Sequence, residues 1–167
     1  MTKPLSPLHP LPVPDQCCDS VAINFIGPLL VDGGYNTIIT FMDHLSSNIC
    51  IIPTVMSLTA EQLAQIFFDV WFCNNRLPLE IVSDHDKLFV SCFWKQLHKL
   101  TRVKLKISSA YHPETDGTSK RTNCRVIQCI HVAIECNQQG WAKALPKVQF
   151  DIMNMIDSST SFTTFQL

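Results

Sequence analysis

The sequence predicts an α/β fold in which a five-stranded mixed sheet, three antiparallel strands followed by parallel crossovers, is flanked by helices. Two observations support this prediction. β-Favouring runs come first and later alternate with helical patterns, an order typical of α/β domains with crossover connections. The chain has 167 residues, of which 46% are apolar and 16% charged, which suits one domain with a sizeable core and excludes a disordered chain.

The start of the chain differs in composition from the rest. Residues 1–16 contain five prolines, and proline supplies no amide hydrogen to a sheet ladder or a helix interior. They are interpreted as an extended arm or linker, and residues 17–167 as the folded domain. The longest apolar run, residues 21–31, is interrupted by Asn24 and Pro28, so no membrane span is predicted. Because no apolar signal segment begins the chain, we expect a nuclear or cytoplasmic protein.

Five segments are rich in the β-branched and aromatic residues that favour strands. The predicted strands are residues 20–26, 35–43, 48–53, 80–83 and 103–107. The second and third are separated by a short turn and should be antiparallel neighbours. The fourth ends just before Asp84. Ligands of α/β sheets bind beside the carboxyl ends of strands, so Asp84 is well placed for chemistry.

Four segments carry apolar residues at helical spacing. The predicted helices are residues 59–74, 91–100, 118–135 and 141–155, the first with Ser57 or Thr59 as its N-cap. Trp71, Trp94 and Trp141 lie on the apolar faces of three of these helices. A position in the core is therefore favoured over base stacking.

Cysteines and histidines give no metal-site pattern. The eight cysteines include no C-x-x-C pair, and the six histidines share no ligand spacing. Reduced, partly buried thiols are predicted.

Positive charge is concentrated in one part of the chain. Residues 1–90 hold three Lys/Arg against nine Asp/Glu, whereas residues 95–125 hold eight Lys/Arg against two acids. The basic residues are Lys95, Lys99, Arg102, Lys104, Lys106, Lys120, Arg121 and Arg125. They suit a phosphate backbone such as that of DNA, and an ordinary solvated face is the alternative interpretation.

Four motifs, in order and with matching spacing, resemble one family. They are DSVAINFIGP at 19–28, IVSDHDKLF at 81–89, FWKQL at 93–97 and HPETDGTSKRTN at 112–123. Together they resemble the integrase catalytic core of gypsy-type LTR retrotransposons, over residues 8–167. The resemblance implies a ribonuclease H-like fold, a role in DNA integration, Mg²⁺ or Mn²⁺ as cofactor, DNA as partner and a possible homodimer.

The family's catalytic signature is two aspartates and a glutamate, and this chain departs from it. Asp84 matches the second aspartate, and thirty-five residues separate it from Lys120, which stands where the family has glutamate. Asn24 stands where the family has the first aspartate. His112 lies in the family loop near the site and is a candidate DNA contact, and Asn123 shares the helix face of Lys120.

These replacements weaken the expected metal site. The family reaction uses two Mg²⁺ ions about 4 Å apart, and Mg²⁺ takes oxygen ligands. Two unit charges about 4 Å apart interact by roughly 4 kcal/mol near a protein surface, and lysine turns this attraction into repulsion. The sequence therefore predicts no productive metal binding at Asp84. Two placements of Lys120 remain open, an ion pair with Asp84 and an orientation toward solvent.

Other acids lie near these positions in the sequence. Asp19, Asp86, Glu114 and Asp116 are interpreted as solvated loop residues, because a Mg²⁺ site demands near-octahedral geometry. Two functions follow from the sequence. The first is an integrase core associated with DNA integration whose strand transfer is impaired. The second is a co-opted or residual DNA-binding or dimerisation module without catalysis.

Overall fold

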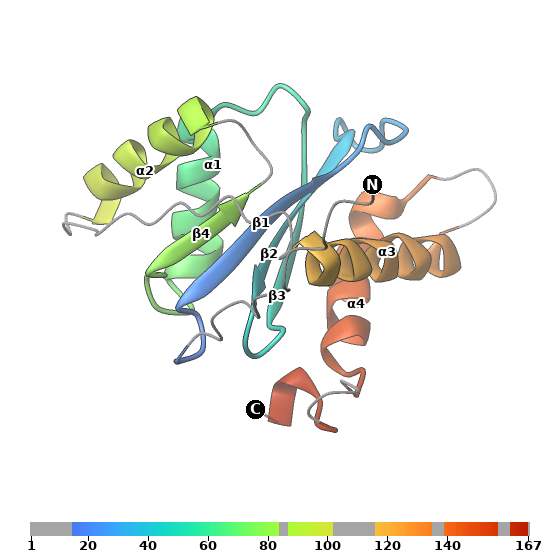
Figure 1. Cartoon of the computed structure of the whole chain (residues 1–167). Helices are drawn as coiled ribbons and strands as arrows, with labels where there is room; N and C mark the ends of the chain where they lie inside the picture. The colour runs from blue at the N-terminus through green and yellow to red at the C-terminus, as the bar shows by residue number, and fades with distance from the viewer. Residues whose placement is uncertain (1–14, 84–86, 102–115, 135–138, 157–160, 167) are drawn as a thin grey trace, which may run out of the picture.

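The computed structural model describes residues 15–83, 87–101, 116–134, 139–156 and 161–166. A four-stranded mixed sheet in the order β3-β2-β1-β4 forms its centre (Figure 1). The strands are β1 (Ser20–Ile26), β2 (Thr37–Asp43), β3 (Ile49–Thr54) and β4 (Glu80–Ser83). β1 and β3 run antiparallel to β2, and β4 runs parallel to β1, which confirms the predicted mixed topology. The predicted fifth strand, residues 103–107, lies outside the described residues.

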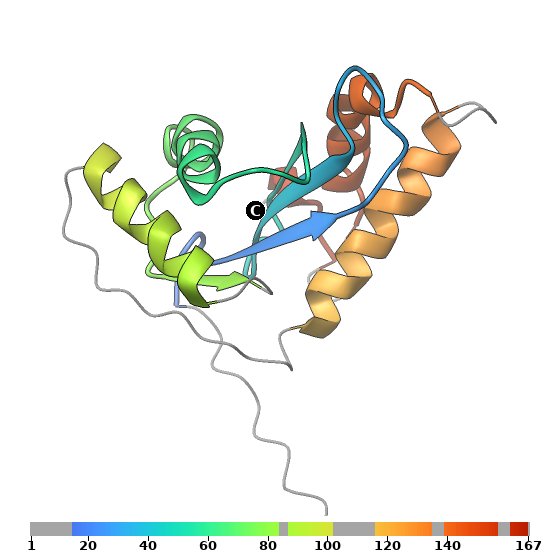
Figure 2. The same cartoon turned by 90° about the horizontal axis from the view of Figure 1, so that it is seen from above.

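Helices cover both faces of this sheet. They are α1 (Ala60–Phe67), α2 (Lys87–Thr101), α3 (Asp116–Ala133) and α4 (Trp141–Met153). α1 continues directly into a π-helical segment, η1 (Phe68–Phe72), and a 3₁₀ turn, η2 (Thr164–Gln166), lies near the end of the chain. The two views agree that α1 and α2 lie on one side of the sheet and α3 and α4 on the other (Figures 1 and 2).

The start of α1 follows from its capping sequence. The Thr59 hydroxyl accepts a hydrogen bond from the backbone N–H of Gln62, and the Gln62 side chain accepts one from the backbone N–H of Thr59. This reciprocal pair satisfies two amides that the first helical turn leaves without a partner. The start of α2 was predicted four residues too late, because Ser91 resembles an N-cap and instead lies inside the helix.

Alternation along the strands divides the core between the two faces of the sheet. Val21 and Ile23 of β1 point into one cluster with α1 and α2, whereas Ala22 and Ile26 point into the other with α3 and α4. The three tryptophans are buried as predicted, with exposed fractions of 0% for Trp71, 1% for Trp94 and 2% for Trp141. The sheet therefore separates two apolar clusters, and each of its faces contributes residues to one of them.

The outer edge of β3 is covered by α4. The Gln149 side-chain oxygen of α4 accepts a hydrogen bond of 2.9 Å from the backbone N–H of Ile51. An uncovered edge strand would present its N–H groups to other chains. Gln149 thereby fixes α4 along one edge of the sheet.

Candidate active-site region at the centre of the sheet

The parallel pairing of β1 with β4 sets the geometry of the candidate site. Ser83, the last residue of β4, pairs with Ile23 of β1. Asn24 follows Ile23 in the sequence, and Asp84 follows Ser83. Asp84 lies outside the described residues, so its predicted proximity to Asn24 stays a prediction.

Asn24 occupies a half-buried position in β1 opposite Thr40 of β2. Paired residues of antiparallel strands project to the same face, here the face covered by α3 and α4. Thr40 is 1% exposed, and its hydroxyl has no hydrogen-bond partner among the residues that the structure describes. Position 24 therefore lies beside a buried hydroxyl group on the same face of the sheet.

The first half of α3 lies near this pair. The Thr122 hydroxyl donates to the sulfur of Met42 at 3.2 Å, and Met42 is two residues from Thr40 on the same face of β2. Lys120, two residues before Thr122, is exposed. Asn123 is half-buried, and its buried side-chain oxygen has no hydrogen-bond partner within the described ranges. The part of α3 that carries Lys120 thus lies over the middle of the sheet, on the same face as Asn24.

Of the four nearby acids, the structure describes the side chain of Asp19 alone. Asp19 forms an ion pair of 2.8 Å with Arg76, and it precedes Asn24 by five residues, about 16 Å along a strand. Asp86 and Glu114 lie outside the described residues, and Asp116 is the first residue of α3. Within the described ranges, no three His, Cys, Asp or Glu side chains are grouped so that they could hold a metal ion.

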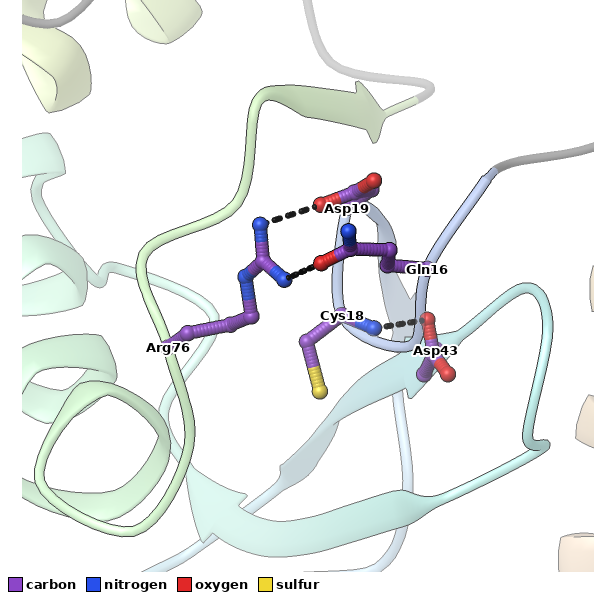
Figure 3. A network of polar contacts seen from close by, with 5 residues as sticks. All are labelled: Gln16, Cys18, Asp19, Asp43 and Arg76. Atoms are coloured by element: carbon purple, nitrogen blue, oxygen red, sulfur yellow. Dashed lines mark hydrogen bonds and ion pairs between the residues drawn. The ribbon is translucent and has the colours of Figure 1, made fainter.

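A polar network fixes the segment that leads into β1 (Figure 3). Arg76 pairs with Asp19 and also donates to the side-chain oxygen of Gln16. The backbone N–H of Cys18 donates to Asp43 at 2.9 Å. Asp43, at the end of β2, is 0% exposed. The burial of this carboxylate was not predicted, although the spacing Asp43-x-x-Ser46 is typical of a turn in which aspartate accepts local hydrogen bonds.

The basic residues of the candidate nucleic-acid surface divide between the two faces of the sheet. Lys95 and Lys99 are exposed on α2, which packs with α1. Arg121 and Arg125 are exposed on α3, which packs on the opposite face. Lys104, Lys106 and His112 lie outside the described residues. A charge pattern along the sequence could not reveal this division, because it depends on which face each helix covers.

None of the cysteines that the structure describes forms a disulfide. All seven cysteines within the described ranges are free, as predicted, and Cys136 lies outside those ranges. Burial raises the pKa of Cys50 to about 11, and burial also raises the pKa values of Cys18 and Cys129. These three thiols therefore stay protonated at neutral pH, a form that is neither a nucleophile nor a metal ligand.

His44 makes a pH-dependent contribution to stability. Burial lowers its pKa below the usual value, while the carboxylates of Asp43 and Glu80 oppose this with a smaller effect. Its Nε2 atom is buried and has no hydrogen-bond partner in the part of the chain that the structure describes. The unfolded chain, whose histidine has a pKa of about 6.5, then binds a proton more readily than the folded chain. The stability contributed by neutral His44 is therefore fully present above about pH 6.5. It decreases as the pH falls below this value, because protonation then favours the unfolded chain.

We expect His44→Asn to reduce the loss of stability on acidification. The melting temperature of the wild type and of the variant would be measured between about pH 7.5 and pH 5, where an ordinary histidine titrates. The other histidines are common to both proteins, so the difference between the two curves isolates His44. Parallel curves would contradict the assignment.

Within the described ranges, no helix combines the length and the apolar character that crossing a membrane requires. No protein-family model matches the chain. Over 165 residues, 99% of the chain, the sequence is 32% identical to the Transposon Tf2-3 polyprotein of Schizosaccharomyces pombe, and equally to the Tf2-4 polyprotein. The chain spans about 12% of the length of these polyproteins.

Solved structures show the same fold. The HTLV-2 integrase catalytic core domain in complex with magnesium, in its trimeric form, gives a TM-score of 0.65 at 14% identity, covering 89% of this chain and 95% of that chain. The simian T-cell lymphotropic virus intasome in complex with the PP2A regulatory subunit B56 gamma gives 0.69 at 13% identity, covering 97% and 60%. The fold is therefore the predicted ribonuclease H-like integrase core. The chain belongs to the retroviral-type integrase catalytic core domains and is homologous to a region of the polyproteins of Tf2, a retrotransposon of the gypsy type.

Proposed function

We propose that this chain is the integrase core of a retrotransposon, associated with DNA in the nucleus or cytoplasm, in which metal-dependent strand transfer is impaired. The replacement of two of the three expected acids, at Asn24 and Lys120, carries this proposal. Asp84 is the one carboxylate left at the three positions. The HTLV-2 core is described in complex with magnesium. In this chain the family's ion would have one carboxylate, one neutral amide and one ammonium group around it.

The chemistry of these donors does not fit two magnesium ions. Mg²⁺ requires oxygen ligands in near-octahedral geometry, and carboxylates supply both the oxygens and the negative charge. The Asn24 amide offers one neutral oxygen, and Lys120 offers only hydrogen-bond donors. A divalent ion about 4 Å from an ammonium group is repelled by roughly 8 kcal/mol at an effective dielectric constant of 20.

The position of α3 supports the assignment of Lys120 to the lost glutamate. α3 packs against β1 through Val126 and Ile130, and Thr122 contacts Met42 of β2. A residue at position 120 therefore belongs to the helix that covers the same face of the sheet as Asn24. No described acid is placed to substitute for the lost ligands, since Asp19 is paired with Arg76 at the start of β1.

Reversion of both positions tests the proposal. We expect the wild type to join no DNA ends in the presence of Mn²⁺, and Asn24→Asp with Lys120→Glu to regain strand transfer because three carboxylates then surround the metal. Each protein would be assayed on the same labelled duplex. Calorimetric titration with Mn²⁺ would show separately whether the reverted protein binds the ion.

The controls separate loss of acids from loss of the fold. Each reverted protein is compared with the same protein carrying Asp84→Ala, which should abolish any regained activity and metal binding. A band-shift assay at low and at higher salt shows whether the variants still bind DNA, because phosphate contacts weaken as salt rises. Strand transfer by the wild type that disappears with Asp84→Ala would disprove impaired catalysis.

A DNA-binding module without catalysis is the second candidate function. The exposed Arg121 and Arg125, one turn apart on α3, favour it, since arginine binds phosphate oxygens. DNA binding by the wild type with no activity after reversion would support this function over the first. A homodimer is compatible with both functions.

A further inference from the structure

We draw no further inference here: the strongest candidate, the apolar groove between the loop after β1, α3 and the start of α4 that Ile26, Ile127 and Trp141 help to line, carries none because nothing in the structure shows what covers it.

Discussion

Replacing Trp71 with alanine is expected to lower the free energy of unfolding by about 3–5 kcal/mol. Trp71 lies in η1 and is 0% exposed. Its ring is stacked on Phe67 with centroids 6.3 Å apart and meets Phe41 edge-on at 6.5 Å. Alanine would leave a cavity beside aromatic side chains of two different elements, α1 and β2, and such rigid neighbours collapse poorly into a void.

Trp71→Phe is the matched control. It keeps an aromatic ring and removes an indole N–H that is buried without a hydrogen-bond partner in the structure. We therefore expect a loss of less than about 1.5 kcal/mol. Urea unfolding of the three proteins would measure both effects. A loss below about 1 kcal/mol for the alanine variant would show that the ring is not closely packed.

Replacing Asp43 with alanine is expected to cost about 2–4 kcal/mol, because three hydrogen bonds lose a charged acceptor in a buried position. One carboxylate oxygen accepts from the Cys18 backbone N–H at 2.9 Å. The other accepts from the backbone N–H and hydroxyl of Ser46 at 2.8 and 2.5 Å. Removal of the carboxylate would leave two buried or half-buried amides without acceptors and release the segment before β1.

Ser46→Ala separates these contributions. It removes the hydroxyl alone and leaves both backbone bonds, so a loss of about 1 kcal/mol is expected. Urea unfolding would give the stabilities, and limited proteolysis would report whether residues 15–19 become accessible in Asp43→Ala. Equal losses in the two variants would mean that the backbone bonds to Asp43 contribute nothing measurable.

The sequence predicted the strands that carry the candidate site accurately. β1 and β4 span the expected residues, because each is a short β-favouring run bounded by turn residues. The predicted first helix, residues 59–74, corresponds to α1 and η1 together, and its change to π-helical geometry at Phe68 has no signal in the hydrophobic spacing. Local patterns fix where an element lies, whereas the geometry of its hydrogen bonds depends on packing.

Long-range contacts explain what the sequence could not predict. The segment before β1 was expected to be a linker as far as residue 16, yet Gln16 is held by Arg76, sixty residues away. Likewise, the buried position of Asp43 depends on Cys18, twenty-five residues earlier in the chain. Such pairs follow from the folded topology. Positions 24, 84 and 120 were assigned from the family resemblance, because each lies in a short motif that the sequence alone displays.

The two apolar clusters on either face of the sheet contain neither Asn24 nor Lys120. The fold is therefore held together by residues other than those at these two positions of the catalytic signature. An element copy can exchange Asp for Asn in β1, or Glu for Lys on an exposed turn of α3, and still produce a folded domain. Under the proposed function, selection on folding and selection on DNA joining act on separate sets of residues. The scaffold can thus outlast the reaction for which it was first selected.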